Sequence, residues 1–347
     1  MRIAIVNDTR MALEVLKRIV ASAPQHEIAW LAQDGVEAVR RCQADTPDLI
    51  LMDLIMPNMD GVEATRQIMT QSPCAILVVT STVAGNTAQV FEAMGVGALD
   101  AVNTPVLDSN DISTGAEVLL HKIDTIARLI GSGPSPAATA AVTTTTTTTS
   151  KDNGLIAIGS STGGPAALAR ILGALPADLP AAVVIVQHVD VQFCADFIQW
   201  LNTQSTLPVR MAAQQDALVP GVVLVANSEK HLSINARGRV AYVDEPAAYA
   251  YRPSVNVLFS SVAQHWQGQA LGVLLTGMGR DGAIGLLEMR QRGFATLAQD
   301  ETSCAVYGMP KAAVALDAAD RVLHISKMAP AMTDWALARQ QKMAAKS

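Results

Sequence analysis

Several features are scarce in this sequence, and each scarcity excludes a class of protein. Aromatic residues make up only 4% of the chain, too few for a surface that stacks single-stranded nucleic acid. The formal net charge of -6 argues against a general nucleic-acid binder, so we expect no nucleic-acid partner. The four cysteines lie far apart without a CxxC pair, which predicts free thiols in a reducing compartment.

Long apolar runs are also missing. The uncharged stretch from Ser72 to Val90 is interrupted by Ser, Thr, Pro and Gly, which is typical of buried strands with loops and not of a membrane span. The opening Met1 to Val6 reaches Asn7 and Asp8 too early for the apolar core of a secretory signal. We therefore expect a cytoplasmic protein that meets a membrane only through its partners.

The chain contains enough apolar residues for two hydrophobic cores, since half of its 347 residues are hydrophobic. Gly131 to Pro136 is rich in Gly and Pro, and an unbroken threonine run follows from Thr143 to Thr149. Such a segment has no apolar face to bury, which predicts a flexible linker. The predicted parts are a first domain (1–130), the linker (131–151), a second domain (152–330) and a C-terminal tail (331–347).

Both domains alternate short apolar runs with amphipathic segments of helical length, such as Met11 to Ala23. In the first domain the predicted strands are Arg2–Val6, Glu27–Leu31, Leu49–Met52, Ala75–Val79 and Ala98–Val102. In the second they are Leu155–Ile158, Ala182–Val186, Val222–Val225 and Ala270–Leu275. This β-then-α alternation predicts an α/β protein with two doubly wound, mainly parallel sheets.

Two carboxylates follow strands of the first domain. Asp8 comes after the first strand and Asp53 after Leu49–Met52, and the carboxyl ends of parallel strands share one edge of a sheet. Two carboxylates and a backbone carbonyl suit Mg²⁺, which would let Asp53 accept a phosphoryl group. Thr80 ends another strand and offers a hydroxyl to the same group. The alternative for an isolated aspartate is an ordinary turn residue.

The segment Met52 to Gly61, together with Thr80, resembles the receiver domains of two-component response regulators. That resemblance implies a flavodoxin-like (βα)5 fold with Asp53 as the phospho-acceptor and Thr80 as the switch hydroxyl. It also implies a Mg²⁺ site formed by Asp8, Asp53 and the Ile55 carbonyl.

Two positions depart from the receiver pattern. The usual acidic pair after the first strand is Asn7-Asp8 here, and the loss of one negative charge should weaken metal binding. The lysine that usually precedes the proline, here Pro105, is Thr104. That change removes a charge-assisted contact to the phosphoryl group.

The second domain carries a serine, a histidine and an aspartate, each past a predicted strand. Gly159 to Gly163 has the G-x-S-x-G spacing that exposes a central serine, Ser161, at a strand-to-helix turn. His188 follows the next predicted strand, and Asp281 lies in a Gly-rich turn after Ala270–Leu275. A serine nucleophile needs a base, and the base needs an anion to hold its tautomer, so the three predict a catalytic set.

Each of these residues by itself has a plainer interpretation. A lone histidine at a strand end is structural more often than catalytic. A Gly-rich loop before a helix, such as Gly163-Gly164, also suits a nucleotide phosphate, although the lysine of a P-loop is missing.

The second domain resembles the chemotaxis protein-glutamate methylesterase family, CheB. The segments that carry the resemblance are Gly159–Pro165, Gln187-His188, Tyr251–Phe259, Thr276–Ala283, Ala298–Glu301 and Gly308–Ala313. One departure is Asn256, where the family usually has Asp. By this resemblance Ser161 is the nucleophile, His188 the general base and acid, and Asp281 its orienting anion. The Met278 N–H then contributes to the oxyanion hole, Thr162 lines the site, and this domain needs no cofactor.

The resemblance implies hydrolysis of glutamate methyl esters on methylated chemoreceptors, with deamidation of receptor glutamines as a further activity. It also implies phosphorylation by a chemosensory histidine kinase. The Asn7-Asp8 opening and Thr104 further resemble the Wsp-type surface-sensing branch. The alternative is a receiver-controlled module that docks on receptors with little or no turnover, for which Asn256 and Thr104 leave room.

Overall fold

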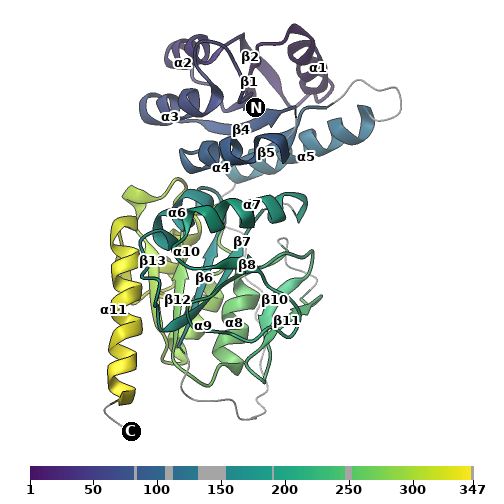
Figure 1. Cartoon of the computed structure of the whole chain (residues 1–347). Helices are drawn as coiled ribbons and strands as arrows, with labels where there is room; N and C mark the ends of the chain where they lie inside the picture. Colours follow the sequence, from purple (N-terminus) through teal and green to yellow (C-terminus); the bar gives the residue numbers. More distant parts are fainter. Residues whose placement is uncertain (82–83, 106–111, 132–153, 190, 247–251, 345–347) are drawn as a thin grey trace. The chain divides into compact units, whose positions relative to one another are not determined.

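A computed structural model describes residues 1–81, 84–105, 112–131, 154–189, 191–246 and 252–344. The chain divides into two compact units, Met1–Ala138 and Thr139–Ser347 (Figure 1). The predicted linker over residues 131–151 lies outside the described residues, apart from Gly131 at the end of a helix.

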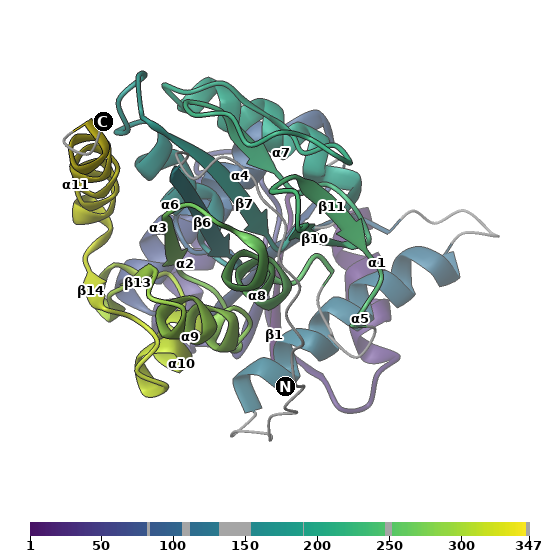
Figure 2. The same ribbon diagram turned by 90° about the horizontal axis from the view of Figure 1, so that it is seen from below.

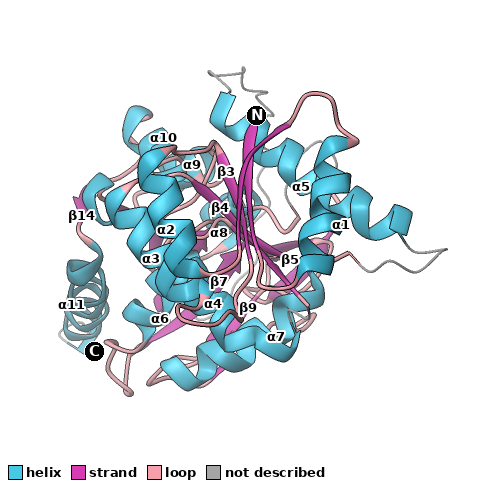
Figure 3. Ribbon diagram, turned by 90° about the horizontal axis from the view of Figure 1, so that it is seen from above, coloured by secondary structure: helices cyan, strands magenta, loops and turns pink. Residues whose placement is uncertain are grey.

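The first unit contains a parallel five-stranded sheet with the strand order β2-β1-β3-β4-β5. Its strands are β1 (Arg2–Val6), β2 (Glu27–Ala32), β3 (Leu49–Met52), β4 (Ala75–Thr80) and β5 (Asp100–Asn103). Figure 3 shows α1 (Arg10–Ala21) and α5 (Ile112–Gly131) on one face, with α2 (Gly35–Ala44), α3 (Gly61–Gln71) and α4 (Thr87–Gly95) on the other. The predicted flavodoxin-like (βα)5 fold is confirmed.

The core of this unit follows from the strand period of two. Ile3 and Ile5 of β1 are fully buried in one cluster with Leu49 of β3 and Leu16 of α1. Burial of each such side chain contributes about 1.5–3 kcal/mol to stability. Because both faces of the sheet are covered, its central strands are apolar throughout.

The second unit contains a parallel seven-stranded sheet with the order β14-β13-β12-β6-β7-β9-β8. The strands are β6 (Gly154–Ser160), β7 (Ala181–Gln187), β8 (Val209–Met211), β9 (Val223–Val225), β12 (Ala270–Leu274), β13 (Ala295–Gln299) and β14 (Arg321–Leu323). The four predicted strands are confirmed as β6, β7, β9 and β12. A separate antiparallel hairpin, β10 (His231–Ile234) and β11 (Val240–Val243), was not predicted.

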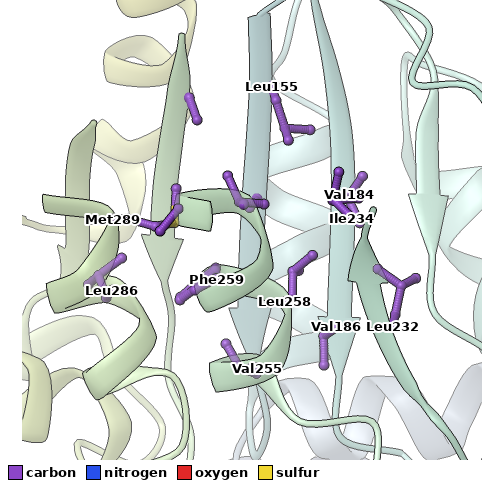
Figure 4. Close-up of a cluster of buried hydrophobic side chains, with 14 of the residues drawn as sticks. Leu155, Val184, Val186, Leu232, Ile234, Val255, Leu258, Phe259, Leu286 and Met289 are labelled. Atoms are coloured by element: carbon purple, nitrogen blue, oxygen red, sulfur yellow. The ribbon is translucent and has the colours of Figure 1, made fainter. Parts of the chain in front are cut away.

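Helices cover both faces of this second sheet (Figure 2). One face carries α8 (Val255–His265) and α9 (Ala283–Gln291), and the other carries α6 (Gly164–Leu172), α7 (Val191–Gln204) and α11 (Ile325–Ala344); α10 (Met309–Ala315) packs beside α9. Figure 4 shows how α8 fills the core: Phe259 lies on the side of Leu286 of α9, and Leu258 lies on the side of the sheet side chains Val184 and Val186.

The C-terminal tail predicted for residues 331–347 is described as far as residue 344. Residues 331–344 belong to α11, and Met328, Met332 and Ala336, spaced by four, are fully buried on the second unit. Arg339 also donates a hydrogen bond of 2.7 Å to the Pro180 carbonyl. Although α11 is long, no helix in the described ranges is both long enough and apolar enough to cross a membrane.

Both sheets have a topological switch point, where the chain reverses the direction in which it adds strands. The first lies between β1 and β3, and the second lies between β6 and β12. Ligands of open α/β sheets bind at the carboxyl ends of the strands beside such a point. The predicted site residues follow these strands or their direct neighbours.

Candidate active site

Ser161 and His188 leave neighbouring strands at the same edge of the second sheet. β6 and β7 pair in parallel with Ser160 opposite Gln187, so Ser161 and His188 are the next residues of the two strands. The His188 N–H donates to the Ser160 carbonyl at 3.0 Å. The structure therefore places the predicted nucleophile and base on adjacent backbones.

Asp281 contacts His188 directly. Its Oδ2 atom lies 2.9 Å from Nε2 of His188, and the two side chains are only 7% and 9% exposed. Because an ionised carboxylate only accepts hydrogen bonds, Nε2 carries the proton of the neutral imidazole. Nδ1 is then the ring nitrogen that would accept a proton from a serine hydroxyl.

The amino end of α8 holds the Asp281 carboxylate. It accepts hydrogen bonds from the Val255 N–H at 2.7 Å, the Asn256 N–H at 3.0 Å and the Ser254 hydroxyl at 2.8 Å. Burial raises the pKa of Asp281, but the hydrogen bond and charge of His188 and these backbone donors outweigh it, so the pKa lies below its ordinary value. The helix dipole acts in the same direction. Asp281 is therefore kept as an anion.

The turn after β12 lies against Ser161. A Cβ atom on Gly277 would lie 2.8 Å from the Ser161 Cβ, so only glycine fits there. The Ser161 N–H donates to the Thr276 carbonyl at 3.0 Å, and the Thr276 hydroxyl donates to the carbonyl of buried Thr162 at 2.9 Å. Gly277 thus lies beside the serine, and Met278, whose N–H is the predicted oxyanion donor, is the next residue in the chain.

Gly163 makes the sharp turn from the serine into α6. Its φ of 75° is in the left-handed region, and a Cβ there would lie 2.4 Å from the Ala305 Cβ. The Gly164 N–H donates to the Ser161 carbonyl at 2.8 Å. The strand, turn and helix expected from the G-x-S-x-G spacing are therefore present.

Asp53 lies at the corresponding edge of the first sheet. β1 and β3 pair with Val6 opposite Met52, and the Asp53 N–H donates to the Val6 carbonyl at 3.0 Å. Burial raises the pKa of Asp53 to about 6, and the negative charge of Asp8 adds to this rise. The two predicted carboxylates are therefore close enough to interact.

Asn7 has a role that the sequence did not indicate. Its buried side-chain amide donates a hydrogen bond of 2.8 Å to Oδ2 of Asp53, while the Leu54 N–H donates to Oδ1 at 2.7 Å. The asparagine therefore replaces a negative charge by a donor to the predicted phospho-acceptor.

Thr80 and Thr104 meet at the ends of β4 and β5. Thr80 is paired with Asn103, and its carbonyl accepts the Thr104 N–H at 2.8 Å. The Thr80 hydroxyl is buried and accepts a hydrogen bond of 3.0 Å from the Asn86 amide. The predicted switch hydroxyl thus has a protein partner in this state.

The residues around Asp53 fit a magnesium ion in ligand type and charge. Asp8 is exposed, as is Ile55, in the loop that follows Asp53, and their oxygens are hard ligands. Burial is the main cause of the raised pKa of Asp53, and the negative charge of Asp8 adds a smaller part that a cation would compensate. Over the described ranges no group of three or more His, Cys, Asp or Glu side chains is arranged to hold a metal. A cation here would therefore depend on two carboxylates, backbone and water.

Ser254 is the residue of this site that sequence reasoning missed. It stands directly before the apolar start of α8, which is the usual signal for an N-cap. Its hydroxyl caps no N–H of α8 and donates instead to Asp281. A serine before an apolar run predicts where the helix starts. It does not predict that the Asp281 carboxylate, and not the serine, accepts the first N–H groups of the helix.

These features define a two-domain response regulator, in which a receiver is joined to an α/β domain with serine, histidine and aspartate at its switch point. The CheB methylesterase family matches residues 156–332, and the response regulator receiver domain matches residues 3–115. The chain belongs to the CheB methylesterase family and carries an amino-terminal receiver domain.

Named relatives agree over nearly the whole length. The Pseudomonas aeruginosa protein-glutamate methylesterase/protein-glutamine glutaminase 3 is 52% identical, over 96% of this chain and 99% of its own. The Cupriavidus metallidurans protein-glutamate methylesterase/protein-glutamine glutaminase 2 is 55% identical, over 95% of this chain and 97% of its own. The crystal structure of the Thermotoga maritima CheB methylesterase catalytic domain is 32% identical, with a TM-score of 0.51, and covers 53% of this chain and 98% of that domain. The family resemblance is confirmed, and the Wsp-type branch stays a prediction.

Proposed function

We propose that this chain is a phosphorylation-regulated serine esterase that hydrolyses glutamate methyl esters on chemoreceptors during chemosensory adaptation. The observation that carries the proposal is the Asp281 carboxylate, which is held as an anion 2.9 Å from His188 beside the strand that presents Ser161. The names of the full-length relatives support the same activity.

In the first half of the reaction Ser161 is acylated. Its hydroxyl oxygen attacks the ester carbonyl while Nδ1 of His188 takes the hydroxyl proton. The Met278 N–H donates to the oxyanion of the tetrahedral intermediate. His188 then returns the proton to the methoxy oxygen, and methanol leaves.

In the second half water hydrolyses the acyl-enzyme. His188 takes a proton from the water, the hydroxide attacks the same carbonyl, and Ser161 leaves with the proton that His188 returns. Asp281 stabilises the imidazolium in both halves and fixes the ring by its bond to Nε2. The product is a free glutamate side chain on the receptor.

The same residues support deamidation of receptor glutamines. A glutamine amide offers the same acyl carbon to Ser161, and the leaving group is ammonia, which also needs a proton from His188. The relatives named above carry glutaminase in their names. We therefore include protein-glutamine glutaminase activity in the proposal.

The receiver supplies the regulation. Asp53 accepts a phosphoryl group from a chemosensory histidine kinase. Asp8, Asp53 and the Ile55 carbonyl would hold Mg²⁺, which would neutralise charge between the carboxylate and the incoming phosphoryl group. In this proposal Thr80 exchanges its bond from Asn86 for one to a phosphoryl oxygen. The kinase, the receptors and a cytoplasmic location stay predictions.

Methanol release from methylated receptor membranes tests the function. We expect release by the full chain, faster with a small-molecule phosphodonor and Mg²⁺, and none from Ser161→Ala. The competing function is receptor docking without turnover. A wild-type chain that sediments with the membranes but releases no more methanol than Ser161→Ala would support that competitor.

A further inference from the structure

Gln187 connects the backbones of Ser161 and His188. It is the last residue of β7 and is only 1% exposed. Its Nε2 atom donates to the Ser161 carbonyl at 2.8 Å and to the His188 carbonyl at 2.9 Å. One amide group therefore ties the predicted nucleophile to the predicted base.

The chemistry of its neighbours fixes the orientation of this amide. Carbonyl oxygens only accept hydrogen bonds, so the NH2 group must face the carbonyls of Ser161 and His188. The opposite end, Oε1 of Gln187, accepts a hydrogen bond of 2.6 Å from the Ser160 hydroxyl. A flipped amide would set its oxygen against two other carbonyl oxygens.

Packing holds the amide in place from the other side. A Cβ atom on Gly164 would lie 1.9 Å from Oε1 of Gln187. The backbone of Gly164, in the first turn of α6, thus packs directly against the side chain of Gln187. Since Gln187 is enclosed by protein on all sides, it has no room for a second arrangement.

We propose that Gln187 is a positioning residue that sets the distance and orientation between Ser161 and His188. It acts through their backbones and, being buried, touches no substrate. Proton transfer from serine to histidine requires the two groups within hydrogen-bond reach. A displacement of about 1 Å at such a site can cost about 100-fold in rate.

A purely structural role is the alternative, because the amide also satisfies two backbone carbonyls inside the protein. Either role predicts a lower melting temperature when the amide is removed. The test therefore needs a readout of the chemistry in each folded molecule.

The test uses two variants and a matched control in the full chain. Gln187→Glu keeps the shape but replaces both donors by an acceptor, and Gln187→Met keeps the length without hydrogen bonds. The control is Thr296→Val, which removes a fully buried hydroxyl bonded to Asp320. Thr296 lies near the amino end of β13, whereas Ser161 and His188 follow the carboxyl ends of their strands.

Two rates are measured per folded molecule: methanol release from methylated receptor membranes, and covalent labelling of Ser161 by a fluorophosphonate. The proposal rests on the proposed function, and labelling does not require the receptor. We expect both Gln187 variants to lower kcat and the labelling rate at least about tenfold while KM stays within about twofold. Thr296→Val should lower the melting temperature and leave both rates unchanged.

Unchanged labelling in the folded Gln187 variants would overturn the proposal. If neither variant folds, Ser160→Ala decides, because it removes only the bond to Oε1. Slower labelling at an unchanged melting temperature then supports positioning, and an unchanged rate overturns it. A wild-type chain that is labelled but releases no methanol refutes the proposed function. The labelling rates of the variants then still test whether Gln187 is a positioning residue. A wild-type chain that shows neither reaction refutes both.

Discussion

The Nε2 atom of His188 lies 2.9 Å from Oδ2 of Asp281, although the two residues are 93 positions apart in the chain. Asp281 in turn is bonded to the amino end of α8, so a helix that contributes no catalytic side chain fixes the anion. This arrangement determines what its replacement should do.

Asp281→Asn should lower kcat by about 10³-fold or more. The amide offers no charge to stabilise the imidazolium, and it can hold the ring in the wrong tautomer. The measurement is methanol release at saturating receptor. The control is Asp244→Asn, which removes an exposed carboxylate paired with Lys230 and should leave kcat unchanged. A loss below tenfold would argue that Asp281 does not orient the base.

The same carboxylate should contribute to stability in a pH-dependent way. Its pKa is lower in the folded chain than in the unfolded chain, so its contribution is fully present above the unfolded value of about 4. That contribution is lost as the pH falls through the folded value. The difference in unfolding free energy between wild type and Asp281→Asn should therefore shrink from pH 6 toward pH 3 in denaturant titrations. A constant difference would contradict this prediction.

Asp53 should have the opposite effect in its own domain. Because its pKa is raised to about 6, the folded receiver keeps a proton between about pH 4 and 6 that the unfolded chain has released. Without Mg²⁺, stability should therefore fall as the pH rises through this window. Calorimetry of Asp53→Asn should show no such loss and, allowing for solvent screening, roughly 1 kcal/mol more stability at pH 7. Parallel pH profiles for the two chains would count against it.

Asn7→Asp should bind Mg²⁺ more tightly, by about tenfold. The change replaces a donor 2.8 Å from Asp53 by a third carboxylate, and the added charge favours a divalent cation. Titration calorimetry measures the affinity directly. Gln43→Glu adds the same charge at an exposed position at the end of α2 and serves as the control. Equal affinities for Asn7→Asp and wild type would show that the ion is held without this position.

Gly277→Ala should disable the site by steric contact. The new Cβ would lie 2.8 Å from the Ser161 Cβ and 2.3 Å from the Met309 sulfur, so the serine turn must move. We expect kcat to fall at least about 100-fold. At Gly293 the space is open but φ is 88°, so Gly293→Ala should cost only stability, about 1 kcal/mol. Similar kcat values for the two variants would refute the steric argument.

The sequence by itself determined the fold and the edges at which chemistry is placed. The central strands, such as β1, β3, β6 and β7, were predictable because a strand buried on both faces is a continuous apolar run. Ser161, His188 and Asp281 were predicted as site residues because each lies past such a run, and Asp8 and Asp53 were predicted in the same way.

Only the tertiary structure decided which groups hold these residues. Ser254 and Asn256 at the start of α8 donate to Asp281, and the side chain of Asn7 donates to Asp53, because packing brings together segments that are distant in the chain. The C-terminal helix α11 packs by a stripe formed by Met328, Met332 and Ala336, and only the assembled second unit supplies the surface that buries it. Periodicity reports which face of an element is buried, but hydrogen bonds depend on positions within a fraction of an ångström, and those are set only when the whole core is assembled.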